Sequence, residues 1–128
     1  MQRIKALVKE PGQSWRLREI DNTLEAFQQI VGGYIEQITL DDNVILIVNE
    51  EGKLRGLAPN FMIPGDMVVG TAIMTYSKSD EFEDIPNIDD IEAALDRGES
   101  IFLAARIGGK MSALGILEGE KTCKTKKS

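Results

Sequence analysis

A run of five apolar residues at positions 44–48 (Val, Ile, Leu, Ile, Val) constrains this chain more than any other stretch. A strand with one face in solvent alternates apolar and polar residues, whereas a strand covered on both faces is apolar throughout. The run therefore predicts a central strand with packing on both sides. It ends at Asn49, where the sequence changes to polar and turn-forming residues.

The segments before this run predict a hairpin, a helix and another strand. Residues 4–9 and 15–20 alternate in polarity on either side of the Pro-Gly turn at 11–14, which is typical of a hairpin. Residues 24–31 carry apolar side chains at helical spacing, after N-cap candidates at 21–23 and before a glycine pair suited to end a helix. Residues 34–40 predict a strand that joins the apolar run through a turn at 41–43.

The second half predicts a fifth strand at 67–76, where Gly70 marks a bulge or a close backbone approach. Ile88, Ile91 and Leu95 then predict a second helix that stops at Gly98. Residues 100–107 fit either a strand or a helix, and we expect the Gly108-Gly109 pair to end that element.

These elements predict one α+β domain over residues 1–117. We expect an antiparallel sheet of about five strands, in the chain order strand, strand, helix, strand, strand, strand, with the helices packed on one face. Residues 118–128, which contain four lysines, predict a disordered tail.

Composition excludes several classes of function. The net charge of −6 argues against broad nucleic-acid binding, which requires many phosphate-neutralising cations. The chain has no histidine, so a Ser-His-Asp or Cys-His mechanism and a Cys/His zinc site are excluded within it. We therefore expect a protein that is not an enzyme and uses no metal or cofactor. One cysteine, Cys123, and no segment of membrane-spanning length predict a cytoplasmic protein.

The polar stretch at 49–60 is the first candidate site, because a strand that ends in such a block commonly presents a functional loop. Lys53 and Arg55 could meet a phosphate or carboxylate, and Asn49 and Asn60 could supply hydrogen bonds. The alternative is that residues 50–53 form a solvated turn and the remainder shapes a loop.

The acidic segment at 80–99 is the second candidate. It holds nine acidic residues and one cation, Arg97, so its net charge is −8. Such a surface can occupy a basic groove on a partner, and in its sharpest form it imitates DNA. The alternative is a solvated loop and helix face. The predicted partner-binding residues are Asp80, Glu81, Glu83, Asp84, Asp89, Asp90 and Glu92.

Several blocks along the first part of the chain occur together in one family. They are the stretches 4–12, 18–25, 31–36, 49–53, 56–60 and 65–71. In order and spacing they resemble the domain of unknown function family 3846, over about residues 2–76. The resemblance implies a small accessory protein of a phage or plasmid, made in the bacterial cytoplasm. It implies no activity, and it fades beyond residue 76.

Two functions follow as hypotheses. The first is a non-enzymatic binding protein of a mobile genetic element that modulates a host protein or defence system, through the acidic segment or the polar stretch. The second is a protein that binds or sequesters a small ligand, such as a nucleotide signal, near Lys53, Arg55 and Asn60. The expected partner is a host or phage protein, and an edge strand would also permit a homo-oligomer.

Overall fold

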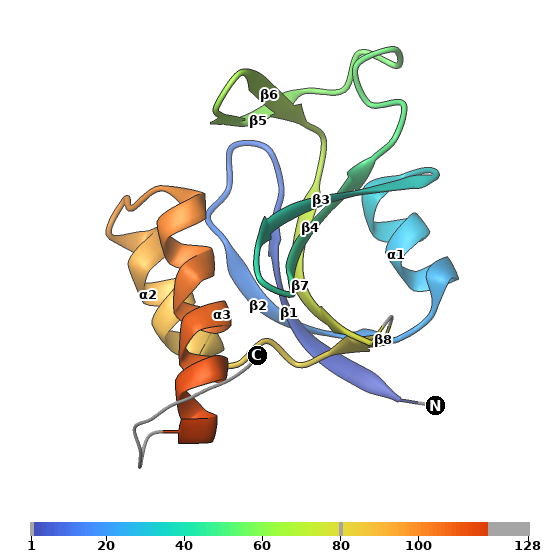
Figure 1. The fold of residues 1–128 in the computed structure, drawn as a ribbon. Coiled ribbons are helices and arrows are strands. Elements are labelled where there is room, and N and C mark those ends of the chain that lie inside the picture. Colours follow the sequence, from blue (N-terminus) through green and yellow to red (C-terminus); the bar gives the residue numbers. More distant parts are fainter. Residues whose placement is uncertain (1, 80, 118–128) are drawn as a thin grey trace.

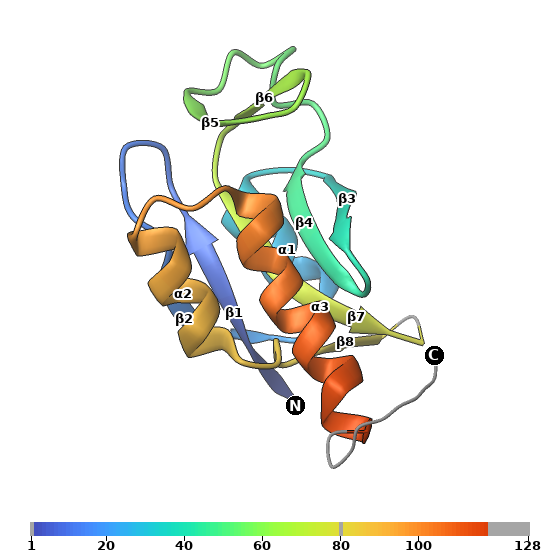
Figure 2. The ribbon, with the colours of Figure 1, turned by 60° about the vertical axis from the view of Figure 1, so that its left-hand side comes forward.

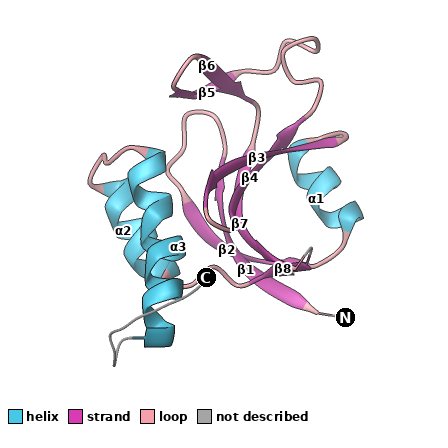
Figure 3. Ribbon diagram, viewed as in Figure 1, coloured by secondary structure: helices cyan, strands magenta, loops and turns pink. Residues whose placement is uncertain are grey.

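The computed structural model describes residues 2–79 and 81–117, with side chains through residue 109. The predicted tail at 118–128 lies outside the described residues. The described part of the chain has three helices around an antiparallel sheet, and Figures 1 and 3 show that the sheet is curved. In chain order the elements are β1 (Arg3–Lys9), β2 (Arg16–Asp21), α1 (Leu24–Val31), β3 (Ile35–Asp41), β4 (Val44–Asn49), β5 (Pro59–Ile63), β6 (Asp66–Val69), β7 (Ala72–Lys78), β8 (Glu81–Glu83), α2 (Ile88–Asp96) and α3 (Ile101–Leu117).

The main sheet has the strand order β2-β1-β7-β4-β3, and every pair in it is antiparallel. The short strand β8 pairs with the C-terminal part of β7, beside the point where β1 leaves it. Strands β5 and β6 form a separate two-stranded hairpin. The predicted α+β class and antiparallel sheet are therefore confirmed.

The apolar run at 44–48 forms β4, a central strand buried along its whole length, as predicted. Leu46 belongs to a core cluster with Ile91 of α2 and Ala104 of α3. Ile47, which points to the opposite face, belongs to a second cluster with Phe27 of α1. The expectation that the helices share one face is wrong: α1 covers one face, and α2 and α3 cover the other (Figures 1 and 2). A strand that is apolar on both sides requires cover on both sides.

Helix α1 begins and ends where the sequence predicts. The Thr23 side chain accepts a hydrogen bond from the backbone N–H of Ala26 at 3.1 Å, which satisfies one of the unpaired donors of the first turn. Gly32 ends the helix in the left-handed conformation, with φ 84°, and its N–H donates to Gln28 O at 2.8 Å.

The strand predicted at 67–76 is two strands in different sheets. Gly70 lies between β6 and β7 with φ 76°, and a Cβ at this position would lie 2.8 Å from the Leu57 side chain. The chain turns here and leaves the hairpin for the main sheet. The sequence predicts no strand where β5 and β8 lie. Strand β5 begins at a proline, which argues against a strand, and β8 has only three residues, too few for a clear pattern.

Helix α3 continues through Gly108-Gly109, which we expected to end the element. A Cβ at Gly108 would lie 3.1 Å from Ile91 Cδ1 of α2. A Cβ at Gly109 would lie 2.8 Å from the Asp41 carboxylate and 3.0 Å from the Asp42 carbonyl oxygen in the β3–β4 turn. The two glycines therefore let α3 approach α2 and the sheet closely, and their missing side chains serve packing.

Replacing Gly109 by alanine should destabilise the protein. At an exposed helix position the same change stabilises by about 0.5–1 kcal/mol, because alanine has the higher helix propensity. Here the added methyl group meets the Asp42 backbone, and overpacking of this kind costs about 1–3 kcal/mol. Chemical denaturation measures the difference, with Arg106→Ala, an exposed position on α3, as the control. A more stable Gly109→Ala protein would contradict the packing described.

Candidate functional site

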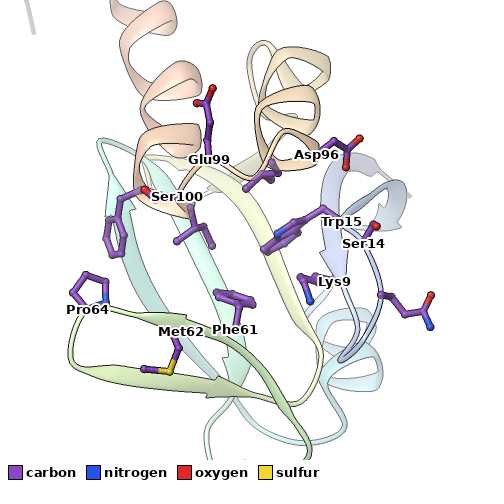
Figure 4. Close-up of a pocket in the computed structure, with 13 residues that line it drawn as sticks. Lys9, Ser14, Trp15, Phe61, Met62, Pro64, Asp96, Glu99 and Ser100 are labelled. Carbon is purple, nitrogen blue, oxygen red and sulfur yellow. The ribbon is translucent and has the colours of Figure 1, made fainter.

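A cleft of about 560 Å³ lies beyond one end of the main sheet (Figure 4). Three parts of the chain surround it: the turn between β1 and β2, the β5–β6 hairpin, and the junction between α2 and α3. Small-molecule sites commonly enclose about 300–1,000 Å³ and are lined mainly by apolar and aromatic side chains. In size the cleft is therefore suited to a small ligand.

Two aromatic rings form the inner part of the cleft. The ring centroids of Trp15 and Phe61 lie 5.5 Å apart at an interplanar angle of 51°. Figure 4 shows the two side chains packed beside each other, Trp15 from the β1–β2 turn and Phe61 from β5. Ile101 and Phe102 at the start of α3 line the cleft as well, and so does Pro64 of the β5–β6 turn. These groups make the interior largely apolar.

One cation, Lys9 at the end of β1, lies beside the rings. Its Nζ is 5.9 Å from the centroid of Phe61 and donates a hydrogen bond to Asn60 Oδ1 at 2.7 Å. The Asn60 Nδ2 group donates to Lys9 O at 2.9 Å and to Gly70 O at 2.7 Å. Partial burial lowers the pKa of Lys9, because the charged form loses hydration.

The junction between α2 and α3 forms the rim. Ser100 Oγ accepts a hydrogen bond from Leu103 N at 3.2 Å, as an N-cap residue does. Glu99 pairs with Arg97 at 2.9 Å between Oε2 and Nη2. The carboxylates of Asp96 and Glu99 point away from the two rings (Figure 4). The rim is therefore negative, while the interior is apolar and holds one positive group.

Asn49, the first of the predicted ligand-binding residues, is 5% exposed. Its Nδ2 donates to Val31 O at 3.1 Å and its Oδ1 accepts from Glu51 N at 2.8 Å. A Cβ at Gly33 would lie 2.9 Å from this amide. Asn49 thus joins the end of α1 to the turn after β4.

Lys53 and Arg55 point to different places. Lys53 forms a hydrogen-bonded ion pair with Asp66 of β6, and this hydrogen bond, together with one from Met67 N, lowers the pKa of the Asp66 carboxyl group. Arg55 Nη1 donates to Gly32 O at 3.3 Å, at the end of α1. The structure does not gather all four predicted residues at one place: Asn49 and Lys53 line a separate small pocket of about 140 Å³, and only Asn60 adjoins the larger cleft, through Lys9. Ligand binding by the other three stays a prediction.

The acidic segment divides into two groups, with Asp80 outside the described residues. Asp84 Oδ1 accepts from Lys5 N of β1 at 2.7 Å, and Glu92 Oε2 accepts from Leu17 N of β2 at 3.3 Å. These two carboxylates therefore satisfy backbone groups of the sheet. The others are exposed, and within the described part of the chain they have no hydrogen bond or ion pair: Glu81, Glu83, Asp89 and Asp90.

Among residues 2–79 and 81–117, no three or more Cys, Asp or Glu side chains are grouped as a metal site. In the same part of the chain, no helix has both the length and the apolar character that crossing a membrane requires.

Comparison with known proteins identifies a family for most of this structure. The family model described as "Domain of unknown function (DUF3846)" matches residues 4–96, from β1 to the end of α2. The chain belongs to this family. No curated protein matched the chain, and no solved structure did.

The DUF3846 match extends past residue 76, where we expected the resemblance to fade, and includes most of the acidic segment. Lys9, Trp15 and Phe61 lie inside the match, whereas Ser100, Ile101 and Phe102 lie beyond it. The cleft is therefore built partly by the DUF3846 region and partly by α3.

Sequence reasoning found Asn60 but missed Lys9, Trp15 and Phe61 as site residues. The available signal was compositional: Trp15 is the only tryptophan in a chain with few aromatics, and it directly follows a turn. Local pattern alone did not place Trp15 against Phe61, because the two residues lie far apart in the chain.

Asn60→Ala should destabilise the DUF3846 domain. The change removes three hydrogen bonds and leaves the carbonyl groups of Lys9 and Gly70 without this donor. Loss of partners for partly buried polar groups costs about 1–3 kcal/mol. Denaturant unfolding measures the loss, and Gln29→Ala on the exposed side of α1 is the control, expected within about 0.5 kcal/mol of wild type. A loss for Asn60→Ala no larger than that of the control would show that Asn60 does not hold the hairpin.

Proposed function

We propose that this chain is a non-enzymatic binding protein that holds a small aromatic ligand in the cleft beside Trp15 and Phe61. One observation carries the proposal: about 560 Å³ lies open beside two facing rings. Side chains fill a protein core to crystal-like density, so a space of this size lined by apolar groups can accept an apolar guest.

The chemistry of the lining favours binding over catalysis. Acid–base catalysis requires a group whose pKa suits proton transfer at the working pH, and histidine, the most frequent such residue, is absent from the chain. Lys9 already donates to Asn60, and its Nζ lies over the Phe61 ring, where it can donate hydrogen bonds to a ligand. The aromatic pair supplies contact area, and Lys9 supplies orientation.

Neutral aromatic fragments test this proposal. We expect indole and 3-phenylpropanamide to perturb the backbone amide NMR signals of Lys9, Trp15 and Phe61 and of residues 95–102. Phe61→Ala should weaken binding about two- to tenfold, because one ring of the pair is lost. Tyr34→Ala, which removes an exposed ring outside the cleft, is the matched control and should bind as wild type does. Perturbations confined to other regions, or no perturbation, would refute binding at this cleft.

A second candidate function rests on the exposed carboxylates of the acidic segment. Glu81, Glu83, Asp89 and Asp90 are free of the backbone contacts that hold Asp84 and Glu92. We infer that they form a surface for a basic protein partner. A DNA-binding host protein that a phage or plasmid encounters, such as a defence protein, fits this chemistry, because an acidic surface can substitute for DNA.

Charge neutralisation tests the second candidate. The variant Glu81→Gln, Glu83→Gln, Asp89→Asn, Asp90→Asn is compared with a control that removes the same charge elsewhere: Glu25→Gln, Glu36→Gln, Glu50→Gln, Glu51→Gln. We expect immobilised wild type and control to retain DNA-binding proteins from a bacterial lysate and to release them when duplex DNA is added. The acidic-segment variant should retain none of them. Equal retention by both variants would show that this surface binds no such partner.

A further inference from the structure

Lys9 is a charged group beside the aromatic pair, and Asn60 holds its ammonium through one hydrogen bond. Both N–H groups of the Asn60 amide are used by backbone carbonyls, so the amide oxygen must face Lys9 Nζ. One of the three ammonium donors is thereby satisfied, and the other two can bind a ligand. The cleft thus presents a hydrogen-bond donor of defined position.

The ammonium has only neutral partners among the described residues, namely the Asn60 amide oxygen and the Phe61 ring, over which Nζ lies 5.9 Å from the centroid. Asn60 Oδ1 accepts its hydrogen bond but carries no charge, and no ion pair of Lys9 occurs in the described part of the chain. Partly buried charges in proteins are normally paired, because lost hydration has to be offset. The depressed pKa of Lys9 agrees with this incomplete compensation. An anion beside Lys9 would compensate for the hydration that the ammonium has lost.

We propose that the natural ligand is an aromatic monocarboxylate, whose ring contacts Trp15 and Phe61 and whose carboxylate pairs with Lys9. This inference rests on the proposed function and adds the charge of the ligand. The cation and the rings are close enough to act on one small molecule, since Nζ lies 5.9 Å from the Phe61 centroid.

The rim limits the charge that the ligand can carry. Asp96 and Glu99 stand at the α2–α3 side of the cleft, and the whole chain has a net charge of −6. Both disfavour a ligand with several negative charges, such as a nucleoside triphosphate. One carboxylate beside one ammonium satisfies Lys9 with the least repulsion from the rim.

A matched pair of probes tests the charge preference. 3-Phenylpropanoate and 3-phenylpropanamide have nearly the same shape and differ in charge. Trp15 is the only tryptophan, so its fluorescence reports occupancy of the cleft directly. We expect the carboxylate to bind about tenfold or more tightly than the amide, because a charge-assisted hydrogen bond is the stronger interaction.

Variants at Lys9 assign that preference to the ammonium. Lys9→Met should abolish the difference in affinity between the carboxylate and the amide. The amide should lose at most the one neutral hydrogen bond that Lys9 can donate to it, and its remaining binding shows that the cleft is intact. Lys9→Arg retains the charge and should keep part of the preference. Lys5→Met, the same change at an exposed position of β1, should behave as wild type.

The outcomes distinguish failure of the carboxylate assignment from failure of the proposed binding function. Equal binding of both probes to wild type, or a preference that survives in Lys9→Met, overturns the carboxylate assignment and leaves the binding function standing. Binding of neither probe refutes the binding function itself, and the assignment falls with it.

Discussion

Burial of the central strands on both faces is the constraint on which the rest of this structure depends. Along β4, side chains point alternately into two separate core clusters, and the adjacent strand β7 contributes Met74 to one cluster and Ile73 to the other. Neither face of these strands is open to a ligand. Binding groups are therefore left to the loops beyond the strand ends and to the outer surfaces of the helices. The cleft lies at such an end, where Lys9 finishes β1.

Polar residues of the stretch after β4 hold neighbouring elements in place, although their composition is typical of a binding loop. Asn49 bonds to the end of α1 and to the following turn, and Arg55 reaches the same helix end. Asn60 bonds to β1 and to Gly70. These hydrogen bonds stabilise the path of the chain from β4 through the β5–β6 hairpin and back into β7. Asn60 has two roles, because the amide that holds the hairpin also orients the Lys9 ammonium.

Much of the sheet could be predicted from the sequence, since strand and helix periodicities are local properties. The run at 44–48 indicated cover on both faces, and Thr23 and Gly32 marked the ends of α1. The predictions failed where contacts between residues far apart in the sequence determine the backbone conformation. Gly109 permits contact with the β3–β4 turn within a helix, although a glycine pair is locally a stop signal. The cleft escaped prediction for the same reason, because Trp15, Phe61 and Ile101 meet only in the folded chain.

The two walls of the cleft come from different parts of the chain, and under the proposed function each would control a different property of the ligand. Lys9, Trp15, Asn60 and Phe61 all lie within the region that matches the family, where hydrogen bonds fix their positions or core packing surrounds them. The opposite wall comes from the first turn of α3, beyond that region. Under the proposed function, the Lys9–Asn60 pair would set the charge of an acceptable ligand, and Ile101 and Phe102 would set its apolar volume. Ile101 and Phe102 are hydrocarbon side chains and take no part in the Lys9–Asn60 hydrogen bonds, so under the proposed function substitutions at the start of α3 would change the size of the ligand without changing its charge.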